Sequence, residues 1–137
     1  TIKEILALPD VKERVDLFFE HQDKFRAQIR RCTTVHKNLA VLDLRNEETI
    51  YAGNRFMIYA LYPECDLSMH VIWGLQKQNT SFAVGRSILK RTATVNVGAL
   101  MLVHSGGGHE GAGTCQVDND KAEATKQRLI ERLTVAA

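Results

Sequence analysis

The sequence predicts an α/β fold: a single domain with a mixed, mostly antiparallel sheet, flanking helices and a long N-terminal helix. Three observations predict it. Apolar residues recur at helical spacing near the start of the chain, short apolar segments bounded by turn residues fill the middle, and a second helical pattern closes it. The 137 residues suit one domain, and 45% hydrophobic with 25% charged residues is a globular composition.

The first predicted element is a long helix that begins near Pro9. Proline suits a first turn, and Arg30 and Arg31 suit the negative end of the helix dipole. The apolar residues follow a 4-3-7-4-3 spacing: Val11, Val15, Phe18, Phe25, Ile29 and Cys32. We interpret this stripe as the face of a helix packed on a core, because a coiled-coil seam, the alternative, needs more heptads.

The middle of the chain is predicted to supply most of the sheet. Residues 38–45 are rich in Leu and Val and predict a buried strand, followed by a turn and a short strand at 49–51. Asn54 can cap a helix that Pro63 ends. Residues 67–75 alternate and lead through a turn into a second strand, 81–87. The residues expected on one face of the first of these strands are Leu67, Met69, Val71, Trp73 and Leu75.

The last part of the chain predicts a helix, a strand and a helix. Asn96 can cap a short helix over residues 97–104, which ends at a run of glycines. Residues 114–117 predict a strand. Asp120, followed three residues later by Glu123, resembles a capping box that opens a final amphipathic helix.

Charge and cysteine content exclude several classes of protein. Eighteen basic and sixteen acidic residues leave a net charge of +2, too small a field to indicate bulk attraction to nucleic acid or a membrane. Three cysteines make no disulfide framework, which favours a reducing, cytoplasmic location. No apolar run approaches the roughly 20 residues of a membrane span, and the N-terminus is not a signal peptide. Because the chain begins at Thr1, we expect it to be part of a longer protein.

The densest motif is the glycine-rich segment from Ser105 to Gly113, which holds five of the nine glycines. Adjacent glycines can expose successive backbone N–H groups as an anion-binding nest, and His109 can donate to the same anion. The alternative is a mobile loop or a helix stop followed by a bulge. The pattern Gly106-x-Gly108-x-x-Gly111 also fits a dinucleotide fingerprint, but a helix precedes it and a strand follows, the reverse of what that site requires.

A second candidate is Val84-Gly85-Arg86-Ser87, with Lys90 and Arg91 soon after. The arginine guanidinium can bind a phosphate or carboxylate with two parallel hydrogen bonds. Taken alone, however, this segment is better interpreted as a solvated basic turn. Arg55 and His70 are weaker candidates.

Metal and nucleophilic chemistry lack support in the sequence. Cys32-x3-His36 and His104-x4-His109 do not have a standard zinc spacing. No cluster of Asp and His that could hold two metals is visible, and no nucleophile is paired with a base, so we predict no catalytic residue and no metal ligand.

Taken together, four motifs resemble the DHH-associated C-terminal domain of the DHH-family phosphoesterases, which include RecJ-type exonucleases, nano-RNases and exopolyphosphatase relatives. They are Val84-Gly85-Arg86-Ser87, Val95-Asn96-Val97-Gly98, Gly106-Gly107-Gly108-His109 and Ala112-Gly113. The exopolyphosphatase-related branch is the most similar, because it also contains stretches like Tyr51-Ala52-Gly53-Asn54-Arg55-Phe56 and Gly113-Thr114-Cys115-Gln116-Val117. The resemblance runs from about Val35 to Val117.

The resemblance implies that residues 1–34 form a linker helix and that residues 35–137 form a substrate-binding domain. It implies that Arg86 and His109 bind substrate phosphate, helped by Ser87 and by the backbone of Gly106, Gly107 and Gly108. Arg55 and Asn96 match motif positions as further candidates, although Asn96 suits a helix cap first. No cofactor is implied for this chain. The metals, manganese in most members, belong to an N-terminal DHH domain of the same protein, which nothing here resembles, so we expect this chain alone to be inactive.

The predicted function is therefore binding of a phosphorylated substrate: a short oligonucleotide, polyphosphate or a phosphate ester. Two alternatives stay open, a nucleic-acid-binding module and a sensor of a phosphorylated ligand with no hydrolase role. The first is disfavoured because few aromatic residues neighbour the Arg and Lys positions along the chain. The stripe of the first helix, if exposed, could also join two copies as a homodimer.

Overall fold

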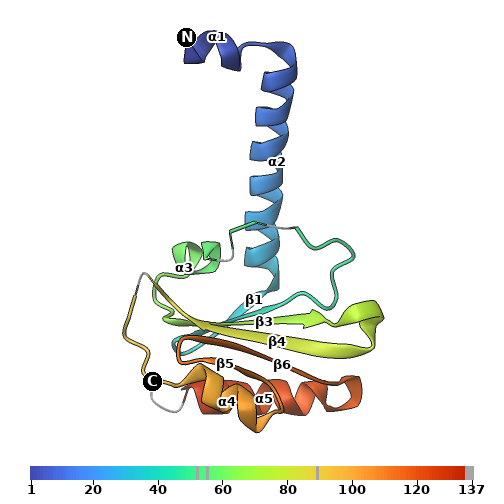
Figure 1. Cartoon of the computed structure of the whole chain (residues 1–137), viewed down its shortest axis with the longest axis vertical. Helices are drawn as coiled ribbons and strands as arrows, with labels where there is room; N and C mark the ends of the chain where they lie inside the picture. Colours follow the sequence, from blue (N-terminus) through green and yellow to red (C-terminus); the bar gives the residue numbers. More distant parts are fainter. Residues whose placement is uncertain (52, 55, 89, 135–137) are drawn as a thin grey trace.

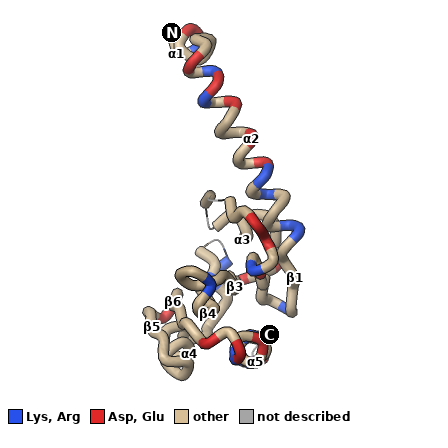
Figure 2. Tube along the Cα trace, turned by 90° about the vertical axis from the view of Figure 1, so that its right-hand side faces the viewer, with Lys and Arg blue, Asp and Glu red and all other residues tan. Residues whose placement is uncertain are grey.

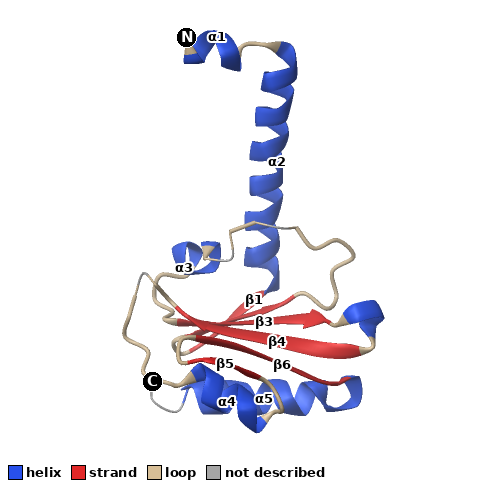
Figure 3. Cartoon of the chain, viewed as in Figure 1, coloured by secondary structure: helices blue, strands red, loops and turns tan. Residues whose placement is uncertain are grey.

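A computed structural model describes residues 1–51, 53–54, 56–88 and 90–134. The chain forms a six-stranded sheet with helices on both faces and one long helix projecting from it (Figures 1 and 3). The helices are α1 (Ile2–Leu6), α2 (Pro9–Cys32), α3 (Met57–Leu61), α4 (Val97–Val103) and α5 (Ala122–Thr134), with 3-10 turns η1 (Leu75–Lys77) and η2 (Asn119–Lys121). The strands are β1 (Thr33–His36), β2 (Leu39–Asp43), β3 (Leu67–Trp73), β4 (Asn79–Arg86), β5 (Gly107–His109) and β6 (Ala112–Asp118).

The sheet has the strand order β1-β2-β3-β4-β6-β5. Its pairs are antiparallel except β2 with β3, which run parallel and are joined through α3. This confirms the predicted α/β class with a mixed, mostly antiparallel sheet and flanking helices.

Two apolar clusters fill the space on either side of the sheet. Helices α4 and α5 cover one face, where alternate residues of the strands point: Leu39, Val41, Leu67, Met69, Val71, Phe82 and Val84. The C-terminal end of α2 and helix α3 cover the other face with Phe25, Ile29, Ile58 and Tyr59. The alternation of β3 therefore separates a buried face from the face that carries Ser68 and His70.

The apolar stripe of helix α2 was predicted to pack on a core along its whole length, and it does so only at its C-terminal end. Phe25 and Ile29 are buried, but Phe18, in the middle of the same stripe, is 57% exposed, and Leu17 and Phe19 are exposed as well. Only the last two turns of the helix therefore reach the core, and the rest projects away from the sheet (Figure 1). The projecting part carries both acidic and basic residues (Figure 2). Helix α1, whose apolar residues are exposed too, precedes α2 and is separated from it by a break at residues 7–8.

The strand predicted at residues 49–51 does not form. The buried side chain of Gln28 occupies that backbone instead: its Nε2 donates to the carbonyl of Thr49 at 2.6 Å, and its Oε1 accepts from the amide of Tyr51 at 3.0 Å. A side chain from α2 thus replaces the neighbouring strand that the segment would need.

Several boundaries also differ from those predicted. Strand β1 follows α2 directly and had no prediction, and β3 ends at Trp73, so that Leu75 lies in η1 with 81% of its surface exposed. Asp120 lies inside η2 rather than at the N-cap of α5. Asn54 accepts from the amide of Phe56 one turn before α3. The predicted cap of α4 is confirmed, since Asn96 Oδ1 accepts from the amide of Ala99.

Among the described residues, no helix is both long and apolar enough to span a bilayer.

Candidate functional site

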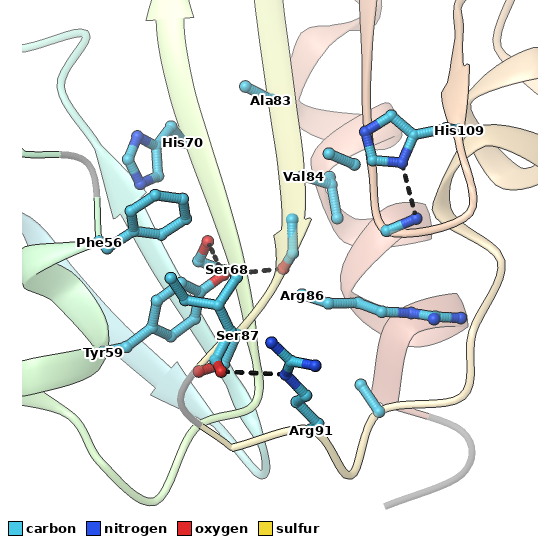
Figure 4. A pocket seen from close by; sticks show the side chains of 15 residues that line it. Phe56, Tyr59, Ser68, His70, Ala83, Val84, Arg86, Ser87, Arg91 and His109 are labelled. Carbon is cyan, nitrogen blue, oxygen red and sulfur yellow. Dashed lines mark hydrogen bonds between the residues drawn. The ribbon is translucent and has the colours of Figure 1, made fainter.

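A cavity of about 390 Å³ opens on the α3 side of the sheet. Its wall is formed by α3, by β3 and β4, by the segment that follows β4 and by the turn between β5 and β6 (Figure 4). The aromatic and polar lining residues are Phe56, Tyr59, Ser68, His70, Arg86, Ser87, Arg91 and His109, and apolar surface comes from Ala83, Ile88 and Ala93. The volume lies in the range of small-molecule sites.

Arg86 stands at the last position of β4 with its guanidinium held from one side. Nε donates to the carbonyl oxygen of Val95 at 2.8 Å and Nη2 donates to the same oxygen, while Nη1 lies 3.5 Å from Oε1 of Glu110. The Arg86 amide also donates to the carbonyl of Gly111. The arginine head is therefore oriented before any ligand arrives, and its side chain is only 22% exposed.

His109 ends β5 and lines the same cavity, on the side across from Phe56 and Tyr59 (Figure 4). Its Nδ1 accepts a hydrogen bond from the amide of Gly111 at 3.1 Å. In the neutral ring this places the proton on Nε2, which makes Nε2 a donor. Arg86 and His109, predicted separately along the chain, are thus brought to one cavity.

Ser87 also lines the cavity, but its hydroxyl has a structural partner. The residue is 4% exposed, its Oγ accepts from the amide of Lys90, and its own amide donates to the carbonyl of Asp66. The buried Asp66 carboxylate accepts from Asn38 at 2.7 Å and from Thr92 at 2.6 Å. These bonds fasten the segment after β4 to the start of β3, and so fix the rim of the cavity.

Several glycines of the glycine-rich segment lie where two stretches of backbone approach closely. A Cβ on Gly106 would lie 2.1 Å from the carbonyl oxygen of Thr114, and one on Gly108 would lie 2.3 Å from that of Ala112. A Cβ on Gly98 of α4 would lie 2.8 Å from the backbone of Gly108. The amide of Gly106 donates to the carbonyl of Met101 and so ends α4. Close packing between α4, β5 and β6 therefore requires several of these glycines.

Two further candidates have a different outcome. Asn96 is the N-cap of α4, the role expected first. Arg55 lies outside the described residues.

The sequence did not single out the aromatic wall of the cavity. Phe56 was singled out only as the last residue of a family-like stretch, and Tyr59 only fell within the helix expected between Asn54 and Pro63. No local pattern places that helix over the end of β4. One signal was available: the alternation of β3 puts Ser68 and His70 on the face away from the strand's apolar residues, and that face forms the floor of the cavity.

The chemistry of the site is that of binding. Two arginines and two histidines line the cavity beside apolar surface, with Glu110 as the neighbouring acid. In the described part of the chain, no three His, Cys, Asp or Glu side chains lie together as metal ligands. The arrangement can therefore hold an anion that carries an apolar group.

Comparison with known proteins adds two relatives of known structure. No protein-family model matches the chain, and no curated protein is significantly similar to it. Over its whole length the chain is similar to the pGpG-specific phosphodiesterase PggH from Vibrio cholerae, with 53% sequence identity and a TM-score of 0.91, and it spans 47% of that protein. An exopolyphosphatase-related protein from Bacteroides fragilis is similar over 82% of this chain and 35% of its own length, with a TM-score of 0.62. At 15% identity, the second likeness concerns the fold alone.

Proposed function

Because this chain belongs to the DHH-associated domains of the DHH-family phosphoesterases, we propose that it is the substrate-binding part of a nucleotide phosphodiesterase. The observation that carries the proposal is the meeting of Arg86 and His109 at one cavity, from two motifs separated in the sequence. These two side chains bind a substrate phosphate, with Nη1 of Arg86 and Nε2 of His109 as donors. Charge-assisted hydrogen bonds of this kind are the strong ones.

The substrate class follows from the relative that shares half of this chain's residues. PggH is described as specific for pGpG. We extend that class, a short phosphorylated nucleotide, to this chain and prefer it to polyphosphate. The mixed lining of the cavity supports this choice, since apolar surface next to cations suits a ligand with both kinds of group.

Hydrolysis itself is assigned to another domain. The described residues offer no three-ligand group for a metal, so the manganese expected for this family does not fit this part of the chain. We propose that an N-terminal DHH domain of the same protein holds the metals and that residues 1–34 link it to the substrate-binding domain. This chain by itself then binds without turnover.

The exposed apolar residues of α1 and α2 support this arrangement: Ile2, Ile5, Leu6, Leu8, Leu17, Phe18 and Phe19. We assign them to the contact with the DHH domain, and a homodimer through the same helices is the alternative. Sedimentation of this chain distinguishes the domain contact from the homodimer, because a homodimer forms without any other domain.

A cytoplasmic location is part of the proposal. Cys32, Cys65 and Cys115 are free thiols, and burial raises the pKa of Cys115 to about 11.

Substitution of the two phosphate ligands tests the proposal. We expect Arg86→Ala and His109→Ala each to weaken pGpG binding about tenfold to a hundredfold, because each removes a charge-assisted hydrogen bond of roughly 1.5–3 kcal/mol. In a double-mutant cycle the two losses should not add, because both side chains bind one ligand. Calorimetry measures the affinities, and Arg128→Ala, an exposed arginine of α5, is the matched control.

Arg86→Lys serves as a second variant. Arg86 also donates to the carbonyl oxygen of Val95, so Arg86→Ala could weaken binding by loosening the backbone around Val95, whereas Arg86→Lys keeps a long cationic side chain. Unchanged affinity for pGpG in Arg86→Ala and His109→Ala, with unchanged melting temperature, would reject the function. Tighter binding of long single-stranded RNA than of pGpG would instead support the nucleic-acid module.

A further inference from the structure

We propose that Phe56 is the stacking surface for a nucleobase of the substrate, on the side of the cavity that α3 forms. The inference rests on the proposed function, because it takes the substrate phosphate to lie at Arg86 and His109. It adds a base subsite and the residue that makes it.

The first argument is the rigidity of the aromatic wall. The rings of Phe56 and Tyr59 are stacked, with centroids 6.4 Å apart and an interplanar angle of 26°. Tyr59 is buried, and its hydroxyl is hydrogen-bonded to Oγ of Ser68 at 2.7 Å and donates to the carbonyl of Gly85 at 2.9 Å. Phe56 therefore rests on a ring that is fixed to both central strands.

The second argument is the position of Phe56 relative to the cations. Figure 4 shows its ring on the α3 wall beside His70, with Arg86 across the end of β4 and His109 on the far wall. The floor between them includes the apolar side chain of Ala83. A ligand that fills this space has a flat apolar part at one end and an anionic part at the other.

The third argument is the chemistry that such a space recognises. An aromatic ring stacks on any base, and loss of one such ring costs roughly 5- to 150-fold in affinity per base. His70, beside Phe56 on the floor that β3 forms, makes this end of the cavity partly polar. Inorganic polyphosphate has no group that gains from an aromatic wall. The wall therefore discriminates between a nucleotide and a polyphosphate, which the phosphate ligands alone do not.

The test compares two probes on the same variant. We expect Phe56→Ala to weaken binding of pGpG at least fivefold and to leave binding of inorganic pyrophosphate within twofold of the original chain. Phe56→Trp, which keeps an aromatic face, should retain pGpG affinity. Phe18→Ala removes the same kind of ring from an exposed position on α2 that does not line the cavity. It should change the affinity for neither pGpG nor pyrophosphate.

The outcomes separate this inference from the proposed function. If Arg86→Ala loses pyrophosphate while Phe56→Ala leaves pGpG unchanged, the base subsite is wrong and the phosphate site stands. If Arg86→Ala leaves pyrophosphate unchanged, the proposed function itself fails. Equal losses of pGpG and pyrophosphate in Phe56→Ala also overturn the inference. Should Phe56→Ala not fold, Phe56→Leu keeps apolar bulk without an aromatic face and must show the same selective loss of pGpG.

Discussion

The Arg86 guanidinium has two different neighbours, and they affect ligand binding in opposite ways. The carbonyl of Val95 holds Nε and Nη2 and presets the orientation of the head. Glu110 faces Nη1 from 3.5 Å with a side chain that is 73% exposed. A phosphate that approaches Nη1 must displace or tolerate this carboxylate, so Glu110 opposes anion binding.

We therefore expect Glu110→Gln to tighten binding of pGpG and of pyrophosphate by about 1.5- to 5-fold, the range of an exposed ion pair. The gain should shrink in about 1 M salt, where charges separated by more than about 3 Å are screened. Isothermal titration measures both effects, with Glu131→Gln on the exposed side of α5 as control. Weaker binding in Glu110→Gln would show that the carboxylate positions Arg86 rather than competing for it.

At the scale of elements, the glycine-rich segment is first a packing device for β5. Gly108 has a φ of +152°, a conformation that side chains rarely adopt, and its Cβ would meet Ala112 and Gly113 of β6. Gly107, its neighbour on the same strand, has no atom within 4 Å of an added Cβ. The two adjacent positions thus differ sharply in what they tolerate.

Gly108→Ala should lower the free energy of unfolding by about 2 kcal/mol or more, because it combines backbone strain with a clash. Gly107→Ala should stay within about 0.5 kcal/mol of the original chain. Urea denaturation followed by circular dichroism measures both. Equal stability of the two variants would mean that β5 does not pack as described.

The same segment shows what the sequence could and could not predict. Helix α4 with its Asn96 cap, and the strands around Leu67 and Val84, followed from local patterns. The pairing of β5 with β6 did not, because glycines carry no alternation. Arg86, taken alone, was interpreted as part of a solvated turn, and only the family resemblance joined it to His109. Phe56 was beyond prediction, since its place in the cavity depends on packing between distant segments.

At the scale of the whole molecule, a charge cluster ties the sheet to its last helix. Asp43 at the end of β2 accepts from Arg45 at 2.7 Å and from Lys126 of α5 at 2.9 Å. Burial alone would raise the pKa of Asp43, but the hydrogen bonds from Arg45 and Lys126 outweigh it and lower the pKa from 3.8 to about 2. The folded state therefore favours the ionised carboxylate.

The stability that Asp43 contributes should be complete above about pH 4 and lost as the pH falls toward 2, because only the folded state keeps this carboxylate ionised there. The loss should be about 2 kcal/mol, the equivalent of the shift. Denaturation curves of Asp43→Asn should show a weaker decline between pH 4 and pH 2. Asp16→Asn, at an exposed position of α2, should decline like the original chain.

Helix α2 is fastened to the sheet at one end only, and this makes it a lever arm. From Phe25 back to Pro9 the helix measures about 24 Å, at about 1.5 Å per residue. A tilt of about 10° at Phe25 would swing Pro9 through about 4 Å, on the order of the helical pitch of 5.4 Å. Small changes in packing around Phe25 and Ile29 would thus set how far anything carried by the arm stands from Arg86.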